Sequence, residues 1–96
     1  MEESNKPKLW IKRNPKWSII SYDFWHMGYD LKDETRKVLY DFVDKIVQES
    51  KSRILKYCCF GRTSGFVVVR SDFLPIFESI IKEKIFDKNN WVEVMI

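Results

Sequence analysis

The residues best suited to chemistry lie in one short stretch. Asp23 ends a run of β-branched and aromatic residues, and His26, the only histidine, follows shortly after it. A carboxylate can hold a divalent cation, and a nearby imidazole can accept a proton. An aspartate at a strand end is also a common turn residue, and an isolated loop histidine more often packs or faces solvent. Catalytic and structural roles therefore both stay open for Asp23 and His26.

Positive charge gathers in two regions. Residues 51–70 hold five basic residues and no acidic one, and residues 1–16 hold five basic residues and two acidic ones. Aromatic residues alternate with the cations, so the cations could contact phosphates while the rings stack on bases. Alternatively, Tyr57, Phe60 and Phe66 are core, and the cations only discourage pairing at a sheet edge. The candidate nucleic-acid-binding residues are Lys12, Arg13, Arg53, Lys56, Arg62, Phe66 and Arg70.

The two cysteines, Cys58 and Cys59, are adjacent in the sequence. Neighbouring side chains on a strand point to opposite faces, so these two cannot form a disulfide framework and we expect free thiols. We expect a cytoplasmic protein, because no apolar run is long enough for a membrane span or a signal peptide. No cofactor is required by the pattern, except Mg²⁺ if the protein is a nuclease.

Six secondary-structure elements are predicted around these residues. The first helix shows the clearest apolar periodicity, with Asp30 placed to cap its amino end. The glycines at 61 and 65 predict a five-residue turn between two strands, and Ser71 or Asp72 is placed to cap the second helix. The predicted elements are a strand over 17–24, a helix over 30–50, strands over 53–60 and 66–70, a helix from 71, and a strand over 91–96.

This element order predicts an α+β domain. Residues 1–16 are expected to form a basic tail that adds a short strand or lays an aromatic ring on the core, and residues 17–96 to form the domain. The order βαββαβ predicts a ferredoxin-like sandwich, an antiparallel sheet with two helices on one face. Right-handed crossovers place its first and third strands side by side. The other face is left for a partner.

The stretch Ile19-Ile20-Ser21-Tyr22-Asp23-Phe24, the later run Ser64 to Ser71, and the surrounding element order resemble the CRISPR-associated protein 2 superfamily, with its VapD-like and SinR-like relatives. The resemblance implies a small ferredoxin-like homodimer. It also implies that Asp23 faces its twin across the dimer and binds Mg²⁺ for phosphodiester cleavage. Lys56 and Cys58 stand where that family has glutamine and serine. Many members of this fold bind DNA or assemble with partners without cutting.

Three functions follow as hypotheses. The first is a dimeric DNA- or RNA-binding protein that contacts phosphates with the basic hairpin and tail, with the acidic helices turned away. The second is a Mg²⁺-dependent endonuclease with Asp23 as catalytic metal ligand. The third is a non-catalytic interaction or assembly module.

Overall fold

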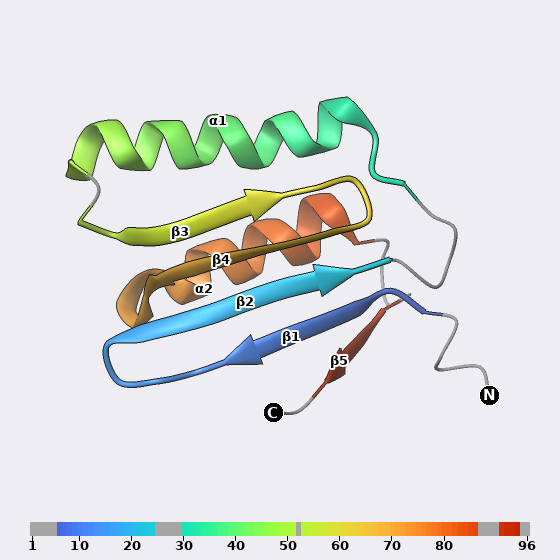
Figure 1. Ribbon diagram of the computed structural model, residues 1–96, viewed down its shortest axis with the longest axis horizontal. Helices are drawn as coiled ribbons and strands as arrows, with labels where there is room; N and C mark the ends of the chain where they lie inside the picture. The colour runs from blue at the N-terminus through green and yellow to red at the C-terminus, as the bar shows by residue number, and fades with distance from the viewer. Residues whose placement is uncertain (1–5, 25–29, 52, 87–90, 95–96) are drawn as a thin grey trace.

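The computed structural model describes residues 6–24, 30–51, 53–86 and 91–94. In these residues, two helices and a five-stranded mixed sheet form an α+β fold (Figure 1). A 3₁₀ turn, Ser71–Phe73, leads into the second helix, and a π-helical turn, Ile81–Ile85, extends it. The elements are β1 (Lys8–Lys12), β2 (Trp17–Asp23), α1 (Asp33–Ser50), β3 (Leu55–Phe60), β4 (Ser64–Arg70), α2 (Leu74–Ile80) and β5 (Val92–Val94).

The strands lie in the order β3-β4-β2-β1-β5. The predicted central pair is confirmed, because β2 runs antiparallel to β4 over their full length. The predicted wholly antiparallel sheet is wrong, because β5 runs parallel to β1. β1 forms an antiparallel hairpin with β2 and occupies the edge of β2. The last strand therefore pairs with β1 instead of β2.

Strand β1 shares the core of the later elements. Its alternating sequence Lys-Leu-Trp-Ile-Lys places Leu9 and Ile11 inward, where they are 0% and 6% exposed. The backbone N–H of Val92 donates to the carbonyl of Pro7 at 2.9 Å, where the parallel pairing begins. Residues 8–12 are thus an integral part of the sheet.

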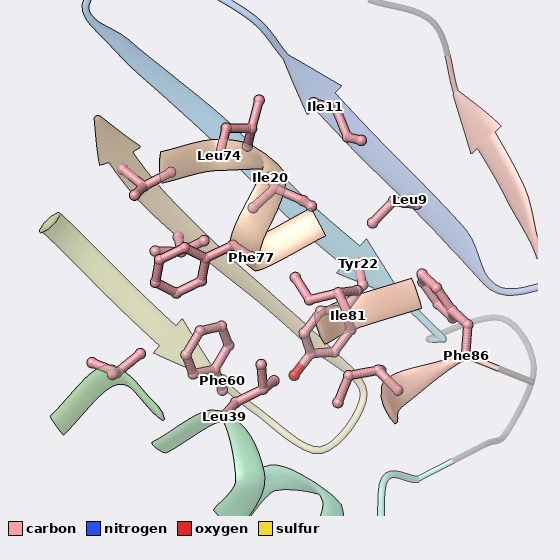
Figure 2. Packing of buried hydrophobic residues seen from close by; sticks show 14 of the residues in the cluster. Leu9, Ile11, Ile20, Tyr22, Leu39, Phe60, Leu74, Phe77, Ile81 and Phe86 are labelled. Carbon is pink, nitrogen blue, oxygen red and sulfur yellow. The ribbon is translucent and has the colours of Figure 1, made fainter. Parts of the chain in front are cut away.

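Both helices pack into one apolar cluster on one side of the sheet (Figure 2). Leu39 of α1 and Phe77 of α2 are 0% exposed. Phe42 and Phe77 meet edge to face with ring centroids 5.1 Å apart, which joins the two helices directly. In Figure 1, α2 lies behind the sheet and α1 runs along β3. The expectation of helices on one side is confirmed.

The start of α1 differs from the prediction. Lys32 is the N-cap and makes no side-chain cap bond, so the expected cap at Asp30 is wrong. The backbone N–H of Leu31 instead donates to the carbonyl of Arg62 at 2.8 Å, and Leu31 is buried. This contact keeps the approach to the helix extended. Asp33 and Glu34 occupy the first turn as expected.

The turn between β3 and β4 is tighter than the two glycines suggest. The N–H of Gly61 donates to the carbonyl of Ser64 at 2.8 Å, and Gly65 already pairs in the sheet with Phe60. A Cβ at Gly65 would lie 2.6 Å from the Tyr22 hydroxyl oxygen. Glycine is therefore needed here for close packing rather than for turning.

The second helix begins without the expected side-chain cap from Ser71 or Asp72. The Ser71 hydroxyl instead lies 2.7 Å from the buried Ser18 hydroxyl and donates to the carbonyl of Asn14. These bonds join the β1–β2 turn to the end of β4. Pro75 occupies the first turn of α2, as predicted.

Candidate functional site

The face of the sheet opposite the helices is not covered by any described helix (Figure 1). We call it the open face. Along β2, inward residues are buried and outward residues are only partly so, which follows from the two-residue period of a strand. The open face comprises Lys8, Trp10, Lys12, Trp17, Ile19, Ser21, Asp23, Tyr57, Cys59, Ser64, Phe66, Val68, Arg70, Val92 and Val94, with Lys56 reaching over Trp17.

One cross-strand row spans all five strands on this face. Cys59 lies opposite Phe66, which lies opposite Ser21. Ser21 lies opposite Trp10, which lies opposite Val94. Two aromatic side chains therefore flank a small hydroxyl residue in register.

A second row carries apolar side chains with a cation at its end. Tyr57 lies opposite Val68, which lies opposite Ile19, which lies opposite Lys12. Tyr57 is 67% exposed and Phe66, in the neighbouring row, is 40% exposed. Aromatic rings on this face thus have surface available for a ligand.

An irregularity in β3 decides which side chains face outward. The register shifts between Leu55 and Tyr57, so Lys56 is an extra residue in this strand. Its ammonium group lies 4.7 Å from the centroid of the Trp17 ring, a cation–π contact on the open face. Tyr57 and Cys59 also face outward, whereas Cys58 lies opposite the buried Val67.

Cys58 and Cys59 are both free and exposed thiols. Burial raises the pKa of Cys58, and the charges of Cys59 and of Asp44 in α1 act in the same direction. Cys58 pairs with the buried Val67 and Cys59 with the exposed Phe66, so the two adjacent side chains point to opposite sides of the sheet.

Three of the predicted cations reach the open face: Lys12, Lys56 and Arg70. The Arg70 guanidinium also pairs with Asp72 at 2.6 Å and lies 5.6 Å from the Phe73 ring centroid. Arg70 is therefore held at the end of β4.

The remaining predicted arginines do not join this surface. Arg62, in the β3–β4 turn, pairs with Asp33 of α1 at 3.5 Å. Hydrogen bonding to Arg36, then the charge of Arg62, lowers the pKa of Asp33. Arg13 pairs with Glu78 of α2 at 2.8 Å.

Arg53 follows α1 and lines a shallow depression with Arg70 at the end of the sheet away from the β3–β4 turn. The basic hairpin is therefore not one continuous positive surface, and two of its cations contact carboxylates near the helices.

Asp23 ends β2 on the open face, opposite Ser64 on one side and Lys8 on the other. Among the described residues, no three histidine, cysteine, aspartate or glutamate side chains are grouped to hold a metal ion. The candidate base His26 lies outside the described residues.

Sequence reasoning missed several residues of the open face. Trp10 and Trp17 are not among the predicted binding residues, and Lys8 is included only as a part of the basic tail. The alternation over Lys8–Lys12 contains the signal, since it places lysine, tryptophan and lysine on one face of a strand.

Comparisons with protein-family models, curated proteins and solved structures found no match to this chain. In the part of the chain that the structure describes, neither helix has the length and apolar content needed to cross a membrane.

Proposed function

We propose that this protein binds single-stranded nucleic acid on the open face of its sheet. The observation that supports this most directly is the sharing of one face by aromatic rings and cations. The rings are those of Trp10, Trp17, Tyr57 and Phe66, and the cations those of Lys8, Lys12, Lys56 and Arg70.

The aromatic residues favour unpaired bases as the ligand. Stacking of a base on an exposed ring is worth about 1–3 kcal/mol. Bases in a duplex already stack on one another, so they cannot lie flat on Tyr57 or Phe66. A single strand can place successive bases on the rings while its phosphates meet Lys12 and Lys56.

We also propose that the fold is ferredoxin-like with one inserted strand. Strands β2, β3, β4 and β5 with helices α1 and α2 follow the order βαββαβ, and β1 lies between β2 and β5. In folds of this kind an uncovered sheet face is available to a ligand. A second copy of the chain is the competing occupant of the open face.

The experiment is a titration of the protein against labelled oligonucleotides of about twelve nucleotides, followed by fluorescence anisotropy. Single-stranded RNA, single-stranded DNA and duplex DNA are compared at about 50 and about 200 mM salt. We expect tighter binding of the single strands, weakened by salt with a log–log slope of about −0.7 per phosphate contacted. Equal or tighter duplex binding would overturn the single-strand proposal.

Matched variants locate the surface. Phe66→Ala should weaken single-strand binding about fivefold or more. Ile76→Ala, on α2, is the control, because Ile76 is 44% exposed and Phe66 40%. Lys12→Ala should lower affinity and the salt slope, whereas Lys84→Ala, in the π-helical turn on the helix side, should change neither. Equal effects of Phe66→Ala and Ile76→Ala would remove the open face from the proposal.

Two further measurements address the alternatives. Metal-dependent fragments that vanish in Asp23→Ala would favour the endonuclease hypothesis, with Asp23 as metal ligand. A solution mass twice that of one chain, reduced by Phe66→Glu, together with no oligonucleotide binding, would favour a homodimer formed through the open face.

A further inference from the structure

One end of the sheet brings together segments from three parts of the chain. At this end, on the left of Figure 1, α1 and β4 end, β3 begins, and the β1–β2 turn closes. The backbone N–H of Arg70 donates to the carbonyl of Ile54 at 2.8 Å. The backbone N–H of Ser71 donates to the carbonyl of Lys16 at 2.9 Å. These bonds hold the segment after α1 and the β1–β2 turn against the end of β4.

Two shallow depressions at this end share Arg70. The first includes Trp17 of the open face and is lined by Pro15, Lys16, Trp17, Arg70 and Asp72. The second lies beside the end of α1 and is lined by Glu49, Ser50, Lys51, Arg53, Ile54, Arg70 and Phe73. Together they extend the open face past Arg70 to the segment that follows α1.

The side chains that line these depressions are mainly positive. Lys16, Lys51 and Arg53 are exposed, and in the described part of the chain none of them forms a salt bridge. Arg70 pairs with Asp72 through one terminal nitrogen and is partly exposed. Because a guanidinium has several N–H donors, Arg70 can contact a second anion while it keeps this pair.

The chemistry of the second depression favours phosphates over bases. The aromatic residue in its lining is Phe73, and the Arg70 guanidinium lies 5.6 Å from the centroid of that ring. The ring is therefore occupied by a cation, whereas N–H donors are available for phosphate oxygens. Glu49 adds one carboxylate, which Lys51 and Arg53 outnumber.

We infer that this basic end, defined as Lys16, Lys51, Arg53 and Arg70, binds phosphates of the same single strand that lies on the open face. This inference rests on the proposed function and extends its site. Bases stack on the rings of the open face, and the backbone beyond them continues past Arg70 to Arg53. Because every nucleotide carries the same phosphate, these contacts add affinity without base preference.

The test measures how salt weakens the binding of a labelled single strand of about twelve nucleotides, RNA or DNA, whichever the wild type binds more tightly. Lys16→Gln and Arg53→Gln remove cations on the two sides of Arg70. Each should weaken binding about threefold or more at about 100 mM salt and lower the log–log salt slope by about 0.7. The double variant should lower the slope by about 1.4.

Arg62→Gln is the matched control. Arg62 belongs to the same basic stretch of sequence but lies at the opposite end of β4, paired with Asp33 at 3.5 Å. Because charges further apart than about 10 Å are largely screened at this salt concentration, the control should bind within about twofold of the wild type and keep its slope. Urea midpoints equal to that of the wild type would show that all variants fold.

The outcomes separate this inference from the proposed function. If Lys16→Gln and Arg53→Gln keep the wild-type slope, or if Arg62→Gln lowers it as much as they do, the basic end is overturned and binding on the open face stands. Two strands bound per chain would overturn the single continuous path.

Two other outcomes would overturn both proposals. One is that Phe66→Ala binds as tightly as the wild type while Arg53→Gln binds weakly, because the strand would then not cross the open face. The other is that the folded wild-type protein binds no oligonucleotide at low salt.

Discussion

The two faces of the sheet use their apolar side chains differently. On the helix side, Ile20, Val67 and Val69 are 0% exposed and belong to the shared core. On the open face, Phe66 comes from the same strand as Val67 and Val69 but is 40% exposed. Alternate positions of a single strand therefore enter very different environments.

This difference separates residues that stabilise the fold from residues available for binding. Full burial of a phenylalanine side chain stabilises the folded state by about 1.5–3 kcal/mol, and a ring that stays exposed contributes only a small part of this. The open-face rings thus add little to folding. They keep contact surface that a ligand can cover.

The largest expected effect tests this division of roles. Phe77→Ala should lower the free energy of unfolding by about 3–5 kcal/mol, because Phe77 packs in the core against Phe42. Phe66→Ala should cost less than about 1 kcal/mol, because much of the ring is already in water. Urea denaturation of both variants measures the two values. Similar losses would mean that Phe66 also supports the fold.

An intermediate effect is expected for adjacent residues at the start of β4. Gly65→Ala should cost about 1–3 kcal/mol, because the new methyl group meets the Tyr22 ring. That ring has little freedom to move, since Tyr22 is 1% exposed and its hydroxyl donates to the Gly61 carbonyl at 2.9 Å. Ser64→Ala, exposed and outward-facing, is the control and should change stability by less than about 0.5 kcal/mol. Thermal or urea unfolding would measure both, and an unchanged Gly65→Ala midpoint would contradict the packing argument.

The smallest effect concerns the two thiols. With the single-thiol variants Cys58→Ser and Cys59→Ser, a bound oligonucleotide should slow iodoacetamide alkylation of Cys59, which lies on the open face, and leave the alkylation of Cys58 unaffected. The thiolate is the reacting form, and burial raises the pKa of Cys58. The alkylation rate of Cys58 should therefore keep rising as the pH passes the ordinary pKa of a thiol. Mass spectrometry follows both rates, and equal protection of both thiols would contradict the assignment of opposite faces.

Local patterns were sufficient to predict much of the fold. β2 ends at Asp23, one residue before the end of the predicted strand, α1 ends at Ser50 as predicted, and the pairing of β2 with β4 was expected from crossover handedness. The sequence pattern could not predict which strand β5 pairs with. β5 pairs with β1 rather than β2, and this depends on contacts between segments that are far apart in the sequence. Likewise, Asp30 has the chemistry of a cap, but a bond from Leu31 to a distant turn determines the helix start.

The candidate site was less predictable for similar reasons. Because Lys56 is an extra residue in β3, the side chains after it point to the opposite faces from those that strict alternation along the strand would give. The alternating pattern of the sequence cannot show this extra residue. Two of the cations in residues 51–70 form ion pairs. Arg62 pairs with Asp33, which is far away in the sequence, and Arg70 pairs with Asp72, two positions further along. Composition identified a basic, aromatic-rich region, but register and ion pairs determine which of its side chains share a surface.

The parallel pairing of β1 with β5 has a consequence for folding on the ribosome. Because Lys8, Leu9 and Trp10 pair with Val92, Glu93 and Val94, the edge of β1 that faces away from β2 stays unpaired until β5 has been synthesised. A nascent chain that ends before β5 leaves an edge of β1 unpaired and open to other chains. The pairing joins segments that are far apart in the sequence, so we expect it to be a slow, late step in the assembly of the sheet.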